Sequence, residues 1–233
     1  VYLFAPDRKA ERPIAHLQHF RGVLHVDGYA GFERVAARPD VTLAACWAHT
    51  RRKFYDVEQQ TGSPIAAEAL RRIATLYEIE AKVRGSSPAQ RMAQRQASSR
   101  PHLAAMKRWL EEQLGLVPAR STLAEAIRYA LGRWKGLSRF LDDGRIELDT
   151  NPVERAIRPV ALGRKNHLFA GSDGGGHRWA VICSLIETAK LNGVEPYAWL
   201  SDVLTRVVDG HPAHQLDQLL PWNWKTQNPV NRG

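Results

Sequence analysis

Gly22-Val23-Leu24-His25-Val26-Asp27-Gly28 is the stretch of this 233-residue chain that decides its fold class. Its apolar run is typical of a buried strand, and an Asp-Gly pair commonly ends a strand because glycine lets the backbone turn. The stretch therefore predicts a strand over residues 22–26 with a carboxylate, Asp27, at its carboxyl end.

The segments on either side continue this pattern. Residues 1–4 and 41–46 are further apolar runs of strand type, while residues 10–20 and the segment through Phe32 and Val35 have helical spacing. Alternation of strand and helix is typical of an α/β sheet. Because the chain starts without an initiator Met, and within the first of these runs, we expect it to be a fragment that lacks its beginning.

From Trp47 onwards the pattern is helical. Apolar residues at helical spacing, with serine and proline at helix starts, predict helices over 47–59, 64–84, 88–114 and 118–141. A short strand is predicted over 145–149, followed by helices from Asn151, from about 178 to 191 and from Pro196. The glycine-rich stretch 171–176 is interpreted as a flexible turn.

Composition narrows the functional classes. Lys and Arg number 33 against 24 Asp and Glu, a net charge of +9 that favours a nucleic-acid partner, with a merely basic protein as the alternative. No apolar stretch reaches the roughly 18 residues that span a membrane, and the apolar run at residues 1–4 is too short, and too soon followed by charges, to be expected as a signal peptide. Two cysteines make no disulfide framework, which predicts a cytoplasmic location.

Two carboxylates are candidates for catalysis or metal binding. Asp27 follows a strand at the sheet edge where α/β proteins bind ligands, although Asp-Gly is also an ordinary turn. Glu154 lies in the first turn of the helix that Asn151 opens. It could equally form a capping box with Asn151 or an ion pair with Arg158.

Basic residues gather near both carboxylates and would hold the phosphates of a polyanion. The candidate DNA-binding residues are Arg51, Arg52, Lys53, Arg155, Arg158, Arg164, Lys165, Asn166 and Arg178. A solvated basic face is the alternative. Cys46 and His49 have a spacing seen in zinc sites, but further ligands at suitable spacing are not evident, so Cys46 is interpreted as a buried thiol at a strand end.

Six segments carry a more specific signal: Val26–Phe32, Cys46–Phe54, Asn151–Pro159, Gly163–Ser172, Ser184–Gly193 and Leu220–Trp224. In type and in order they resemble the motifs of transposases of the bacterial insertion-sequence-sixty-six family, and they cover nearly the whole chain.

The resemblance implies an RNase H-like α/β fold, truncated at its N-terminus, with an Asp-Asp-Glu triad that binds two Mg²⁺ ions, or Mn²⁺ in their place. Asp27 matches the second carboxylate and Glu154 the third, whereas Asp7 does not replace the first. Residues 1–60 would then be a partial sheet with its helices, 61–144 a large helical insertion, 145–210 the completion of the catalytic core and 211–233 a C-terminal tail.

The expected function is that of a DNA transposase, which cleaves and joins strands at the ends of a mobile element by two-metal phosphoryl transfer. Its partners would be transposon ends and target DNA, with a homo-oligomer as the active complex, in the bacterial nucleoid. The first alternative is an inactive remnant that binds DNA without cutting it. A nuclease of the same fold is a third interpretation.

Overall fold

The computed structural model describes residues 1–163 and 170–227, with side chains up to residue 224. The chain divides into two compact units. The larger comprises Lys9–Val153, and the smaller combines Val1–Arg8 with Glu154–Gly233. The four-part division expected from the sequence stays a prediction.

The larger unit begins with the predicted alternation of helix and strand. Its elements are α1 (Glu11–His16), β1 (Gly22–Val26), α2 (Gly31–Val35) and β2 (Val41–Ala45). The strands pair in parallel, from Gly22 opposite Val41 to Val26 opposite Ala45. Only Val26 of β1 is buried, so this strand is less enclosed than its apolar run predicts.

Two predicted strands are wrong. Residues 1–4 form no strand, because the backbone N–H of Tyr2 donates to the Ser184 side chain at 2.8 Å instead of to a neighbouring strand. Residues 145–149 are irregular, since Arg145 bonds the Asp143 carboxylate through its backbone N–H at 2.8 Å, and such a local turn competes with a strand. Helices make up 68% of the described residues, and the sheet has two strands within them, so the RNase H-like fold stays a prediction.

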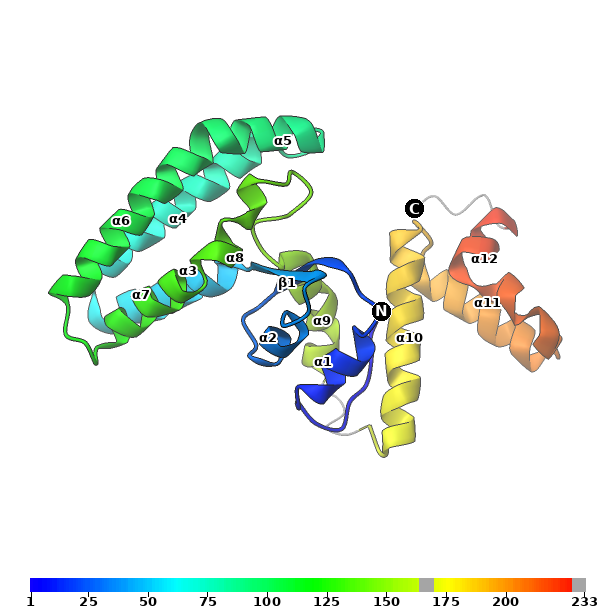
Figure 1. The fold of residues 1–233 in the computed structure, drawn as a ribbon. Helices are drawn as coiled ribbons and strands as arrows, with labels where there is room; N and C mark the ends of the chain where they lie inside the picture. Colours follow the sequence, from blue (N-terminus) through cyan, green and yellow to red (C-terminus); the bar gives the residue numbers. More distant parts are fainter. Residues whose placement is uncertain (164–169, 228–233) are drawn as a thin grey trace. The chain divides into compact units, whose positions relative to one another are not determined.

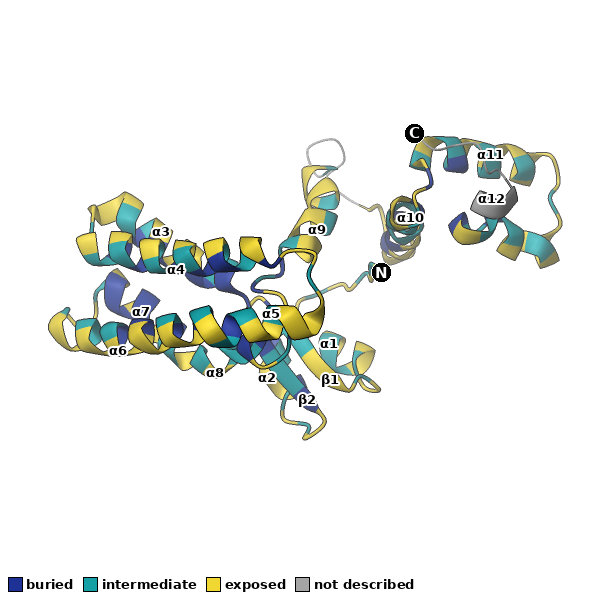
Figure 2. Ribbon diagram, turned by 90° about the horizontal axis from the view of Figure 1, so that it is seen from above, coloured by how far each residue is buried: buried dark blue, intermediate teal, exposed yellow. Residues whose placement is uncertain are grey.

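A helical body follows the sheet. Its elements are α3 (Trp47–Thr61), α4 (Pro64–Lys82), α5 (Pro88–Gln94), η1 (Arg95–Ser99), α6 (Arg100–Leu116), α7 (Thr122–Gly132), α8 (Trp134–Leu137) and η2 (Arg139–Leu141). α3 packs against α4 and α7, and α6 also contacts both of these helices (Figure 1). The dark stripes in Figure 2 mark their shared core, which includes Trp47, Phe54, Ile73 and Ile127.

The helix predicted over 88–114 is not one continuous α-helix, because a five-residue π-helix, η1, separates α5 from α6. A π-turn adds a residue to the helix and re-aims its neighbours. Here Arg95 becomes fully buried, where it donates to both carboxylate oxygens of Glu80 at 2.9 and 2.6 Å and to the Phe140 carbonyl at 2.9 Å. The predicted helix over 118–141 is likewise divided into α7, α8 and η2.

Apart from Val1–Arg8 and the connecting turns, the described residues of the smaller unit form helices. It holds most of α9 (Asn151–Gly163), with α10 (Asp173–Leu191), α11 (Pro196–Val208), η3 (Ala213–Leu219) and α12 (Pro221–Gln227). Two buried indoles close its core: Trp199 donates to the Leu219 carbonyl at 2.9 Å and Trp224 to Asp202 at 2.7 Å. No helix of the described residues is long and apolar enough to cross a membrane.

The prediction that the glycine-rich stretch is a flexible turn is wrong for its second half, because α10 begins at Asp173. Gly174–Gly176 lie inside the first turn of this helix, where the Ser172 hydroxyl accepts the backbone N–H of Gly175 at 3.1 Å. Gly176 is buried against the Phe4 ring, which leaves no room for a β-carbon. Gly175, beside the Ala170 carbonyl, and Gly176 therefore allow close packing at a helix start.

Candidate catalytic and DNA-binding residues

Asp27 follows β1 directly, as predicted, and is exposed. One carboxylate oxygen, Oδ1, accepts the backbone N–H of Tyr29 at 2.9 Å, which forms an Asx turn and fixes the side chain. The other oxygen, Oδ2, has no hydrogen-bond or ion-pair partner among the described residues. The side chain thus has the bond of an ordinary Asp-Gly turn and one oxygen that a ligand could take.

The backbone of this turn is held from α7. The hydroxyl of Tyr129 donates to the Asp27 carbonyl at 3.3 Å, and the guanidinium of Arg133 donates to the Gly28 carbonyl at 3.4 Å. Gly28 has a φ of +94°, and a β-carbon there would lie 2.7 Å from the Tyr129 hydroxyl. Glycine is required at this position by its backbone angle and by its neighbour.

The Tyr129 ring makes cation–π contacts with two cations near the Asp27 turn. The Arg133 guanidinium lies 4.0 Å from the centre of its ring and the Lys53 ammonium 5.6 Å. Burial raises the pKa of the Tyr129 hydroxyl, and the Asp27 charge adds to this effect while the Arg133 charge opposes it. Lys53, a predicted DNA contact, therefore lies near the ring of Tyr129, whose hydroxyl donates to the turn that carries Asp27.

Tyr129 and Arg133 did not stand out in the sequence. Tyr129 lies in the last turn of α7 and Arg133 follows directly after that helix, so their spacing of four residues brings the ring and the cation together and is the signal that could have found this pair. The other predicted cations of α3 are exposed: Arg51 lies 5.8 Å from the Tyr55 ring, and Arg52 pairs with Asp56 at 3.1 Å.

Glu154 lies in the first turn of α9, as predicted, and is exposed. The helix begins at Asn151 itself, and the Asn151 amide donates to the Asp149 carboxylate at 2.6 Å. Asp27 belongs to the larger unit and Glu154 to the smaller, so their joint role stays a prediction.

Asp149 and Thr150, which precede α9, are hydrogen-bonded within the larger unit. Thr150 donates to the Cys46 sulfur at 3.3 Å through its backbone N–H and also through its hydroxyl. The Tyr77 hydroxyl donates to Asp149 at 2.9 Å, and burial, followed by the Asp149 charge, raises the pKa of Tyr77. Cys46 is thus a buried thiol just beyond a strand, and the described residues hold no group of three His, Cys, Asp or Glu that could bind a metal.

The remaining predicted DNA contacts lie in the smaller unit. Arg155 and Arg158 are exposed on α9, and Arg178 is exposed on α10. Arg164, Lys165 and Asn166 lie outside the described residues.

A strand-end carboxylate beside unneutralised cations suits a protein that acts on a polyanion. The particular family follows from comparison with known proteins. The model of the IS66 transposase family matches residues 1–178, and that of the IS66 C-terminal element matches residues 184–222. The chain belongs to the IS66 transposase family, as its motifs predicted.

Similar curated proteins come from Sinorhizobium fredii. The uncharacterized protein y4qI is 46% identical over 232 residues, and this match covers 97% of the chain and 43% of y4qI. The uncharacterized protein y4hP is 42% identical over 241 residues, which covers 97% of the chain and 44% of y4hP. The chain therefore spans less than half the length of these relatives. No solved structure matches it.

Proposed function

We propose that this chain is part of a DNA transposase in which Asp27 and Glu154 are the catalytic carboxylates. The observation that carries the proposal is the state of Asp27: it ends a parallel strand, its orientation is fixed by the Asx turn, and its Oδ2 is open. Carboxyl ends of parallel strands are where α/β proteins bind ligands, and this chain belongs to a transposase family.

Asp27 and Glu154 each offer the type of donor that a magnesium ion bound together with DNA would accept. Mg²⁺ prefers hard oxygen ligands and is commonly held by one or two carboxylates together with substrate phosphates and water. Asp27 offers one open oxygen and Glu154 a second exposed carboxylate, and Mn²⁺ would accept the same donors. When bound, the ions would activate the attacking hydroxyl and stabilise the leaving oxygen of the phosphodiester.

The cations around these carboxylates would hold the DNA backbone. Lys53 and Arg133 stand beside the Asp27 turn, while Arg155 and Arg158 follow Glu154 on α9. Lys and Arg neutralise phosphates and fix the register of the duplex without reading its sequence. The protein would then work on transposon ends and target DNA in the nucleoid, as a homo-oligomer that pairs two ends.

Strand transfer by the full-length protein tests the carboxylates. With a pre-cut end of its own element, a plasmid target and Mg²⁺, we expect Asp27→Asn and Glu154→Gln each to lower the rate by about 100-fold or more, because each loses several kcal/mol of transition-state stabilisation. Asp56→Asn, which removes a carboxylate of α3 that pairs with Arg52, should stay within about twofold.

Other outcomes separate the alternatives. Unchanged strand transfer with Asp27→Asn would overturn the assignment. DNA binding with neither cleavage nor joining would favour a DNA-binding remnant, and metal-dependent cleavage without joined product would favour a nuclease.

A further inference from the structure

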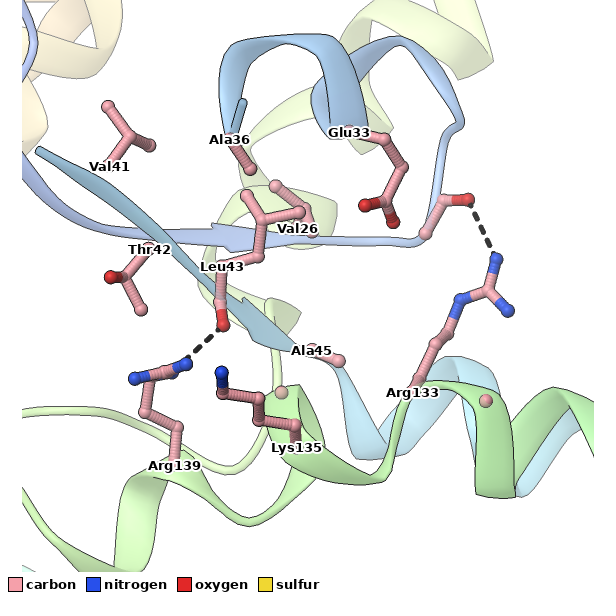
Figure 3. Close-up of a pocket in the computed structure, with 13 residues that line it drawn as sticks. Val26, Glu33, Ala36, Val41, Thr42, Leu43, Ala45, Arg133, Lys135 and Arg139 are labelled. Carbon is pink, nitrogen blue, oxygen red and sulfur yellow. Dashed lines mark hydrogen bonds between the residues drawn. The ribbon is translucent and has the colours of Figure 1, made fainter. Parts of the chain in front are cut away.

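A pocket of about 360 Å³ lies directly beside the Asp27 turn, within the larger unit (Figure 3). Its apolar wall is formed by Val26 of β1 and Leu43 of β2, and Gly28 reaches its rim. Arg133, Lys135 and Arg139, from the segment that joins α7, α8 and η2, lie along one side. None of these three was a predicted DNA contact.

The charge of this pocket is not balanced. Three cations line it against the single carboxylate of Glu33, a surplus of two positive charges. None of the ion pairs of the described residues involves any of the three cations. Unpaired cations gathered in one concave site favour an anionic ligand.

Two of the cations are held in place without being neutralised. The Arg139 guanidinium donates through Nε to the Leu43 carbonyl at 3.1 Å, and that of Arg133 donates to the Gly28 carbonyl while lying on the Tyr129 ring. A guanidinium has five N–H donors, so each keeps further donors for a ligand. Lys135 is exposed and makes no such contact within the described residues.

We propose that this pocket holds the phosphodiester backbone of a DNA strand next to Asp27. The inference rests on the proposed function and deepens it, because it names the residues that would hold a strand beside the candidate catalytic carboxylate. Cations spread along one side, over residues 133–139, suit successive phosphates of a chain better than one compact anion. The sugars and bases of the strand would pack against the apolar wall of Val26 and Leu43.

Binding of a labelled 30-base-pair duplex, followed by fluorescence anisotropy between 50 and 300 mM salt, tests the pocket. The logarithm of the binding constant falls with the logarithm of salt by about 0.9 per phosphate contact. Losing one contact through Lys135→Gln should therefore reduce this slope by about 0.9 and weaken binding about eightfold at 0.1 M salt. The matched control Arg108→Gln removes one exposed charge from α6, outside the pocket, and should stay within twofold.

Lysine acetylation with and without the duplex locates the contact independently of affinity. We expect DNA to protect Lys135 at least threefold and to leave Lys107, half-exposed on α6, unchanged. Equal behaviour of Lys135→Gln and Arg108→Gln, or no protection of Lys135, would overturn the pocket while leaving the role of Asp27 intact. Failure to bind the duplex at any salt would overturn both proposals. If Lys135→Gln abolished saturable binding of inorganic pyrophosphate but left duplex binding unchanged, the pocket would be a site for a free anion, and the DNA assignment would be overturned.

Discussion

Gly28→Ala should destabilise the turn that carries Asp27. Gly28 has a φ of +94°, which costs a residue with a β-carbon about 1–3 kcal/mol. The new β-carbon would also lie 2.7 Å from the Tyr129 hydroxyl, closer than such atoms approach, and would displace a hydrogen bond worth about 0.5–1.5 kcal/mol. After an offset of about 0.4–1 kcal/mol from the stiffer unfolded chain, the expected net loss is about 2–3 kcal/mol.

A second substitution separates the two causes of this loss. Tyr129→Phe deletes the hydroxyl and should cost about 0.5–1 kcal/mol by itself, because it removes the 3.3 Å bond to the Asp27 carbonyl. In the double variant the close contact is gone while the φ strain remains. The double variant should therefore be about 1 kcal/mol more stable than the sum of the two single losses predicts.

Urea unfolding, read by hydrogen exchange of peptides from the larger unit, measures these differences without interference from the smaller unit. The wild-type chain and the three variants complete the cycle. A loss below about 0.5 kcal/mol for Gly28→Ala would refute the strain argument. Strict additivity would show that Tyr129 does not press on the turn.

Three further predictions concern stability. Glu80→Gln should cost the larger unit about 3–5 kcal/mol in urea unfolding, because it leaves the fully buried Arg95 cation uncompensated; a loss under 1 kcal/mol would contradict this. Burial raises the pKa of Glu80, but hydrogen bonds from Arg95 and Arg91 outweigh burial, so the pKa is lowered in the folded protein. The stability that the ionised Glu80 contributes is therefore fully present above its ordinary pKa near 4.5. It is lost as the pH falls through the lower pKa of the folded protein. An acid titration should show a shallower loss for Glu80→Gln than for wild type, and equal slopes would argue against the coupling. Gly176→Ala should destabilise the smaller unit by about 1–3 kcal/mol through the Phe4 ring, and Phe4→Ala should cancel most of the additional cost, as thermal unfolding would show.

Most helices and the two paired strands could be predicted from the sequence because their signals are local. A strand before Asp27, helices from Trp47, Pro64 and Pro196, and a helix start at Asn151 all agree with the structure. Periodicity of apolar residues, caps and prolines acts over a few residues, so neighbouring letters suffice to read it.

Apart from residues 145–149, where a local turn at Asp143 replaces the predicted strand, the failures occur where a distant partner wins over local preference. Residues 1–4 look like a strand, but Tyr2 bonds Ser184, 182 residues away. The helix over 88–114 has a regular pattern, yet burial of Arg95 against Glu80 accompanies a π-turn that periodicity does not reveal. The glycines at 174–176 look flexible, but they lie in the first turn of α10, and Phe4, 172 residues away, fills the space beside Gly176.

The sequence by itself determined the family, the parallel strand pair, the position of Asp27 at a strand end and of Glu154 in a first helical turn, and the excess of positive charge. Tertiary structure alone decided what surrounds Asp27. Tyr129 meets the Asp27 turn across 102 residues, and Arg133, Lys135 and Arg139 become the side of one pocket because α8 and η2 pack beside β2. Such contacts follow from the packing of whole elements, and no spacing along the chain encodes them.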